Sequence, residues 1–346
     1  MNKKFTVLDL FCGCGGLSLG FIQAGFDVKL GIDVWSDAIK TFISTHQNAK
    51  GIVADLFSVK PQEISKQTGI KKVDVIIGGP PCQGFSIAGK RMIDDERNQL
   101  YKSFVEFVKF YQPKAFLMEN VPNMMSMGKG VIKDQITQDF ESLGYFVYSK
   151  ILMASDFGVP QNRRRAFFVG FKKECNFEFP TPFVTEKITT FEAISDLPDY
   201  SLNDGENYPF AIESEYQKLM RKNSKGLFNH QVTQHNEKTV SIISLVPDGG
   251  NYKDLPDEFK NTRNVNIAWT RLNSQKPSFT IDTGHNHHFH YKFNRVPTVR
   301  ESARIQSFPD DFIFLGTKTS QLRQVGNAVP PMLAKVLAKQ ILKYME

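Results

Sequence analysis

The fold is decided by the stretch Thr6-Val7-Leu8-Asp9-Leu10-Phe11-Cys12-Gly13-Cys14-Gly15-Gly16. Its apolar first half predicts a short buried strand, and its glycine-rich second half predicts a tight turn that opens a helix near Leu17. Glycines in such a turn let a ligand approach the backbone closely above the end of the strand. The turn lacks the G-x-G-x-x-G spacing of dinucleotide sites, so by itself it is a weak signal of a cofactor.

Strands and helices alternate outward from this turn. Apolar runs predict strands over 28–32, 73–77, 115–118, 145–152 and 166–171, and helical spacing predicts helices over 17–24, 36–46 and 100–110. This alternation predicts the α/β class, with a doubly wound, mostly parallel sheet covered on both faces.

A second, loop-rich unit interrupts the pattern. From about residue 186 to 295 the chain is rich in Asn, Asp, Gly, Thr and Pro, and the alternation stops. We therefore expect a first domain over 1–185, an inserted smaller domain over 186–296, and a return segment over 297–346. In that segment, residues 297–314 bridge the domains and an amphipathic helix over 331–345 completes the first one.

Composition narrows the functional classes. The chain has 346 residues, 41% hydrophobic and 23% charged, which is typical of a globular protein. No apolar run approaches the roughly 20 residues that span a bilayer, no signal peptide is evident, and four cysteines make a poor disulfide framework, so we expect a cytoplasmic protein. The formal net charge of +7 favours a polyanionic partner. Residues 186–295 hold 13 Lys and Arg against 14 Asp and Glu, so the excess positive charge lies elsewhere.

Cys82 is the most informative cysteine. It lies in the run Gly78-Gly79-Pro80-Pro81-Cys82-Gln83-Gly84-Phe85-Ser86, directly after the apolar stretch 73–77. A thiol where a buried strand opens into a loop faces whatever binds above the sheet, which favours a nucleophile. Cys12 and Cys14 lack a second Cys or His pair nearby, so small buried loop residues are favoured there over a metal site.

Acidic residues follow three further strands. Asp33 is placed to accept hydrogen bonds from ribose hydroxyls, and Asp55 from an adenine amino group. Either alone is typical of a solvated loop or a helix cap, but with the glycine-rich turn the two favour a nucleoside-containing cofactor. Glu119 ends the strand over 115–118, where burial tends to raise the pKa of a carboxyl group. A structural acid is an equal alternative for Glu119.

A run of arginines precedes the last strand. In Gln161-Asn162-Arg163-Arg164-Arg165, alternation along an extended chain places Arg163 and Arg165 on one face and Arg164 on the other. Such a run is more often a solvated edge than a catalytic clamp.

Six segments together resemble one family, the DNA cytosine methyltransferases that modify carbon 5 of the base. They occur in order over nearly the whole chain: Asp9-Leu10-Phe11, Pro80-Pro81-Cys82, Glu119-Asn120-Val121, Gln161-x-Arg163-x-Arg165, Arg300-Glu301-Ser302-Ala303-Arg304 and Gln324-Val325-Gly326-Asn327. Any one could arise by chance, whereas six in order and spacing could not readily do so. The resemblance implies a Rossmann-like methyltransferase fold with an inserted target-recognition domain over 186–296.

The resemblance also implies a reaction. Cys82 is implied as the nucleophile that adds to carbon 6, Glu119 as the acid that binds ring nitrogen 3, and Arg163 and Arg165 as groups that orient the base and steady the thiolate. The methyl donor would be S-adenosyl-L-methionine, with no metal. The target cytosine, stacked in duplex DNA, would be flipped into the pocket. The base that removes the carbon 5 proton is not identified.

Binding residues follow from the same resemblance. The donor is expected to contact Phe11, Gly13, Gly15, Gly16, Leu17, Asp33, Val34, Asp55, Pro81 and Asn327. DNA is expected to contact Gln83, Ser86, Lys90, Arg91, Arg97, Thr280, His285 and His287. Residues 84–98 resemble a mobile loop that closes over DNA, and Thr280-Ile281 a short signature of target recognition. For the histidines of 285–290, DNA contact or a surface loop is favoured over metal binding.

Two alternatives remain open. A tRNA-methylating branch of the family usually carries a Cys-Phe-Thr motif, which this sequence lacks. A DNA-binding protein with a dead active site fits poorly with the intact Cys82, Glu119 and Arg165. We therefore expect a bacterial restriction–modification methyltransferase, EC 2.1.1.37, acting as a monomer without an obligate protein partner. A cognate restriction endonuclease would act on the same site.

Overall fold

The computed structural model describes residues 4–81, 99–260, 269–282 and 288–345. The chain divides into two compact units. The sheet unit consists of Met1–Met153, Arg164–Pro182 and Leu333–Glu346, and the second unit of Ala154–Arg163 and Phe183–Met332.

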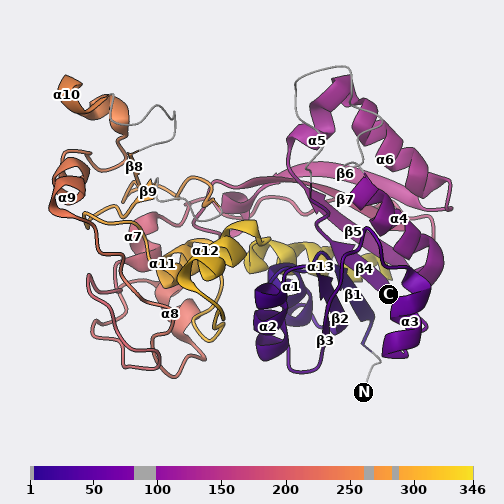
Figure 1. The fold of residues 1–346 in the computed structure, drawn as a ribbon. Helices are drawn as coiled ribbons and strands as arrows, with labels where there is room; N and C mark the ends of the chain where they lie inside the picture. The colour runs from indigo at the N-terminus through magenta and orange to yellow at the C-terminus, as the bar shows by residue number, and fades with distance from the viewer. Residues whose placement is uncertain (1–3, 82–98, 261–268, 283–287, 346) are drawn as a thin grey trace. The chain divides into compact units, whose positions relative to one another are not determined.

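A seven-stranded sheet forms the centre of the sheet unit, in the order β3-β2-β1-β4-β5-β7-β6 (Figure 1). Its strands are β1 (Thr6–Leu10), β2 (Asp27–Asp33), β3 (Lys50–Val53), β4 (Val75–Gly78), β5 (Ala115–Asn120), β6 (Phe146–Met153) and β7 (Arg164–Phe171). Neighbours from β3 to β5 pair in parallel, and β7 pairs antiparallel with both β5 and β6. The predicted α/β class and mostly parallel sheet are confirmed.

Helices cover both faces of this sheet. They are α1 (Gly16–Gln23), α2 (Ser36–Thr45), α3 (Pro61–Thr68), α4 (Gln99–Tyr111), α5 (Asn123–Ser126), the 3₁₀ turn η2 (Met127–Gly130), α6 (Val131–Glu141) and α13 (Pro331–Met345). One core cluster joins alternate strand residues such as Leu8, Ile76 and Phe116 to Phe104 of α4 and Phe140 of α6. Because side chains alternate across a strand, Val7 and Asp9 face the opposite side, where α1 packs.

The predicted C-terminal helix is confirmed. It spans Pro331–Met345, and Ala334 lies so close to Gly20 of α1 that a Cβ at Gly20 would be 2.3 Å from the Ala334 Cβ. The segment Leu333–Glu346 belongs to the sheet unit.

Strand order reverses between β1 and β4. The chain proceeds from β1 to β2 and β3 on one side, then returns to place β4 on the other side of β1. In open α/β sheets, ligands bind beyond the carboxyl ends of the strands at such a reversal. The glycine-rich turn after β1 and Gly79-Pro80-Pro81 after β4 both lie at that edge.

The second unit has short elements joined by long loops. They are η3 (Ala154–Phe157), α7 (Thr190–Ile194), α8 (Glu215–Arg221), α9 (Glu237–Ser244), η4 (Tyr252–Asp254), α10 (Asp257–Lys260), β8 (Thr270–Arg271), β9 (His288–Phe289), α11 (Val299–Ile305) and α12 (Lys318–Asn327). Two apolar clusters stabilise the unit, one around Leu272 and Ile305 and the other around Ile243 and Phe289.

Buried ion pairs hold α11 in place. Arg304 contacts Asp196 at 2.5 Å and Asp310 at 2.7 Å, and Arg295 contacts Glu301 at 2.8 Å. Thr298 caps α11, and its backbone N–H donates to Glu301. The segment Arg300–Arg304, one of the six that carry the family resemblance, therefore stabilises the second unit through buried ion pairs. Across the described ranges, no helix is long and apolar enough to cross a membrane.

Candidate active site

The glycine-rich turn is tied to the end of β2. The backbone N–H of Gly13 donates to Asp33 Oδ2 at 2.8 Å, and that of Trp35 donates to Asp33 Oδ1 at 2.9 Å. Phe11 has a φ of 56°, and the Cys12 N–H donates to the Ile32 carbonyl at 3.1 Å. Asp33 thus fixes the turn at the end of β2.

Asp9 lies buried beneath the turn. Its side chain is 1% exposed, and Oδ2 accepts from Ser18 Oγ at 2.6 Å. Gly15, the N-cap of α1, has no side chain to cap the helix, and the Asp9 carboxyl group holds the Ser18 hydroxyl in the first turn of α1 from β1. Burial, opposed by the hydrogen bond from Ser18, raises the pKa of Asp9 to about 8. Sequence reasoning treated Asp9 only as part of a motif; its position on the helix-covered face of β1 was the available signal.

Two expected donor contacts are accessible at the same edge. Val34, directly after β2, is 66% exposed, which is unusual for an apolar side chain beside a buried strand. Asp55 is exposed beyond β3, and Oδ1 accepts from the Phe57 N–H at 2.9 Å. The Ala54 N–H donates to the Asp33 carbonyl at 3.0 Å, which joins the ends of β2 and β3.

Glu119 and Arg165 form an ion pair. Arg165 Nε lies 2.8 Å from Glu119 Oε1, and the two side chains are only 16% and 12% exposed. The pairing follows from topology: β7 runs antiparallel to β5, so the start of β7 lies beside the end of β5, with Asn120 opposite Ala166. Gly79 lies close by, since a Cβ there would be 2.9 Å from Glu119 Oε2.

Asn120 connects β5 to the segment that leads to Cys82. Its Nδ2 donates to the Pro80 carbonyl at 2.8 Å, and its Oδ1 accepts from the Val121 N–H. Pro81 follows and is exposed. Cys82, Gln83, Ser86, Lys90, Arg91 and Arg97 lie outside the described residues, as do His285 and His287.

The remaining expected site residues belong to the second unit. Arg163 is 1% exposed; Nη2 donates to the Gly326 carbonyl at 2.8 Å and Nη1 to that of Ile281 at 3.3 Å. Arg163 precedes β7 and belongs to a different compact unit from Arg165, although the two alternate in sequence. Asn327 ends α12 and is exposed, and Thr280 Oγ1 donates to the Asn162 carbonyl at 3.2 Å.

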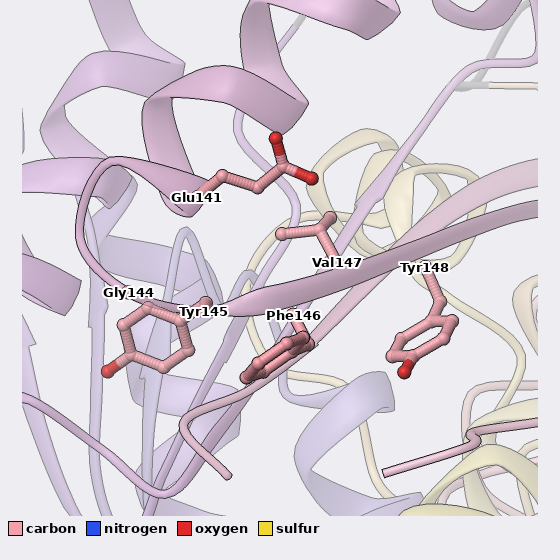
Figure 2. A pocket seen from close by; sticks show the side chains of 6 residues that line it. All are labelled: Glu141, Gly144, Tyr145, Phe146, Val147 and Tyr148. Carbon is pink, nitrogen blue, oxygen red and sulfur yellow. The ribbon is translucent and has the colours of Figure 1, made fainter. Parts of the chain in front are cut away.

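A separate pocket of about 410 Å³ lies at the outer strand β6 (Figure 2). It is lined by Glu141 and residues 144–148. Within that lining, Phe146 pairs with Phe171, which pairs with Ala115 at the start of β5. The pocket therefore lies level with the amino ends of the parallel strands, at the opposite edge from the glycine-rich turn.

Cys12 and Cys14 are buried, as predicted. Burial raises the pKa of the Cys14 thiol to about 12 and that of Cys12 well above its usual value, so both thiols stay protonated at neutral pH. No cluster of three metal-binding side chains occurs in the described part of the chain.

Comparison with known proteins assigns the family. The family model for C-5 cytosine-specific DNA methylases matches residues 5–343. This chain belongs to that family. Like its relatives, this methyltransferase is a DNA (cytosine-5-)-methyltransferase of the restriction–modification type.

Individual relatives are similar over almost their full length. The chain is 41% identical to the type II methyltransferase M1.HphI of Haemophilus parahaemolyticus, covering 98% of this chain and 87% of that protein. It is 39% identical to M.DdeI of Desulfomicrobium norvegicum, covering 99% and 89%. A crystal structure of a protein from E. coli, provisionally named a prophage-encoded DNA modification methyltransferase, superposes with a TM-score of 0.79 at 29% identity, covering 99% of both chains.

Proposed function

We propose that this methyltransferase transfers a methyl group from S-adenosylmethionine to carbon 5 of a cytosine flipped out of duplex DNA, through a transient bond to Cys82. Its biological function would be to protect host DNA in a restriction–modification system. The Glu119–Arg165 ion pair carries the proposal, because it lies beside the Gly79-Pro80-Pro81 segment that leads to Cys82.

The chain's own groups supply the activation of the base. Carbon 5 of cytosine is a poor nucleophile until the Cys82 thiolate adds at carbon 6 and makes the ring enamine-like. Glu119 binds at ring nitrogen 3, where negative charge develops as the thiolate adds at carbon 6. Arg165 holds the Glu119 carboxyl group in place. After transfer, a base takes the carbon 5 proton, the double bond between carbons 5 and 6 forms again, and the carbon–sulfur bond breaks to release the Cys82 thiolate.

The residues at the strand ends fit the donor. When bound, S-adenosylmethionine supplies an electrophilic methyl group on a sulfonium. Gly13 has no heavy atom within 4 Å of where a Cβ would be, so there is open space beside the turn. Asp33, at the end of β2, would accept from the ribose hydroxyls, the exposed Val34 offers an apolar surface to the adenine ring, and the exposed Asp55 can accept from the adenine amino group.

The second unit would read the DNA sequence. We assign target recognition to residues 186–296, with Thr280, His285 and His287 among its DNA contacts. Phosphate attraction would come mainly from outside this segment, because residues 186–295 carry 13 basic against 14 acidic residues. Flipping the base costs a few kcal/mol of unstacking, which these contacts must offset.

Transfer of label tests the function. Purified protein incubated with tritiated S-adenosylmethionine should label duplex DNA and leave tRNA unlabelled. Bisulfite sequencing of DNA from an expressing host should then show protected cytosines within one short sequence. Label in tRNA alone, or methylation at adenine or at the cytosine amino group, would contradict the proposal.

A further inference from the structure

The rings of Phe42, on α2, and His46, the residue that caps the end of α2, stack against each other. Phe42 and His46 are one helical turn apart, and their rings stack with centroids 4.4 Å apart and planes inclined by 13°. Phe42 is 0% exposed and His46 is 2% exposed. Burial, opposed by hydrogen bonds to two carbonyls, lowers the pKa of His46 from its ordinary value, which favours the neutral ring.

These stacked rings contact the glycine-rich turn directly. A Cβ at Gly15 would be 2.3 Å from His46 Cε1 and 2.8 Å from Phe42 Cδ2, and Gly15 also has a φ of 94°. On β2, a Cβ at Gly31 would be 2.5 Å from the Phe42 ring. These distances are shorter than real contacts, so any side chain at Gly15 or Gly31 would clash with these rings. The rings therefore restrict both positions to glycine and shape the turn.

Both ring nitrogens of His46 face backbone carbonyls. Nε2 lies 3.1 Å from the Gly15 carbonyl, and Nδ1 lies 2.9 Å from the Phe42 carbonyl and 2.9 Å from the Thr45 hydroxyl. A carbonyl can only accept, so a neutral ring donates to one of the two carbonyls at a time. With the hydrogen on Nε2, the ring donates to Gly15 and the Thr45 hydroxyl can donate to Nδ1.

The carbonyl that His46 holds is central to the turn. The Gly15 carbonyl also accepts from the Leu19 N–H at 2.8 Å, which is the first hydrogen bond of α1. Since the peptide group is planar, fixing this carbonyl fixes the orientation of the whole Gly15–Gly16 peptide. Asp33 anchors the Gly13 end of the turn, so the turn has an anchor at each end.

We propose that His46, supported by Phe42, is a positioning residue that holds the Gly15 carbonyl and preorganises the turn for the methyl donor. The identity of the ligand rests on the function proposed above; the anchoring itself does not. Preorganisation lowers the entropy lost on binding, so the anchor contributes to donor affinity rather than to the chemical step.

The variants His46→Leu and His46→Gln test the proposal, with Gln47→Ala at the exposed neighbouring position as control. His46→Leu removes the donor, whereas the Gln amide can still donate to Gly15. Titration calorimetry with S-adenosylhomocysteine should give a Kd raised about tenfold for His46→Leu, the effect of one net hydrogen bond. His46→Gln should recover most of the affinity. DNA affinity and the rate at saturating donor should stay within twofold of wild type.

Amide hydrogen exchange over residues 12–17 tests the anchor without ligand. Exchange should be faster in His46→Leu than in His46→Gln, with Gln47→Ala unchanged. The proposal would be overturned if His46→Leu bound S-adenosylhomocysteine and exchanged its amide hydrogens as the wild-type protein does. It would also be overturned if His46→Leu lost thermal stability with no change in Kd. If the wild-type protein binds no S-adenosylhomocysteine, the proposed function fails, and the exchange experiment still decides whether His46 anchors the turn.

Discussion

Arg165 Nε lies 2.8 Å from Glu119 Oε1, at the point where the last residues of β5 meet the first residues of β7. The parallel neighbour β4 leaves its carboxyl end at the same place, so the Gly79-Pro80-Pro81 segment emerges beside the pair. The antiparallel strand β7 thus places Arg165 beside Glu119 of β5. The segment after β4, which leads to Cys82, emerges next to this pair.

Substituting either member of the ion pair should reduce turnover. Glu119→Gln and Arg165→Lys are expected to lower kcat by about 10²–10³-fold, the usual effect of losing one preorganised electrostatic contact. Lys150→Ala, exposed on β6, is the control and should retain full activity. Tritium transfer to DNA at saturating donor measures the effect; full activity in Glu119→Gln would remove it from the catalytic assignment.

Gly79→Ala should disturb the acid without disturbing the fold. The added Cβ would lie 2.9 Å from Glu119 Oε2, so the carboxyl group must move. Misplacement of a reacting group commonly costs about 10- to 100-fold in rate. We expect that loss in kcat together with a melting temperature close to wild type. A fully active Gly79→Ala protein would show that the carboxyl position is not critical.

Asp9 should make stability depend on pH. Its pKa of about 8 in the folded state lies above the ordinary value of 3.8, so folding favours the protonated form. The contribution of protonated Asp9 to the free energy of unfolding is present below about pH 4 and is lost progressively as the pH rises to about 8. The melting temperature of Asp9→Asn relative to wild type should therefore increase over that range and level off above it.

Asp134→Asn is the matched control for Asp9, because Asp134 is exposed on α6. The difference in melting temperature between Asp134→Asn and wild type should stay constant between pH 5 and 9. The same constant difference in Asp9→Asn would contradict the burial of an ionisable Asp9.

His290 should make the second unit sensitive to acid. Its ring is fully buried, Nδ1 accepts from the backbone of Lys292 and Phe293, and burial lowers its pKa to about 3. Because the unfolded chain takes up this proton near pH 6.5, stability should fall as the pH drops from about 6.5 towards 3. His290→Asn, which keeps an acceptor, should be less stable at pH 7 but show a shallower decline.

Denaturant unfolding at intervals from pH 7 to 5 measures this decline. The window lies above the titration range of Glu301, whose pKa is lowered because Arg295 and the neighbouring histidines outweigh burial. If the free energy of unfolding falls equally with pH in His290→Asn and wild type, His290 does not contribute to the acid sensitivity.

The sequence predicted the sheet unit well because its signals are local. The predicted helix over 331–345 coincides with α13, and the strand over 115–118 lies within β5. The helix α6 was missed, although Ile132, Ile136 and Phe140 recur at helical spacing. Its polar intervening residues weakened the pattern.

Several contacts at the candidate site could not be predicted from the sequence. The Glu119–Arg165 pair depends on β7 running antiparallel to β5, which periodicity does not reveal. The contact of His46 with Gly15 joins residues 31 positions apart, and it arises only when α2 packs on the turn. Alternation suggested a shared face for Arg163 and Arg165, but Arg163 precedes the strand and is enclosed by carbonyls of the second unit.

A covalent trap tests the central claim most directly. DNA carrying 5-fluorocytosine at the methylated position, mixed with protein and S-adenosylmethionine, should yield a complex that survives denaturation, because fluorine cannot leave as a proton does. Peptide mass spectrometry should place the nucleotide on Cys82, and Cys82→Ser should form no complex. If the wild-type protein methylates cytosine normally but forms no adduct, or forms one on another residue, the account is contradicted.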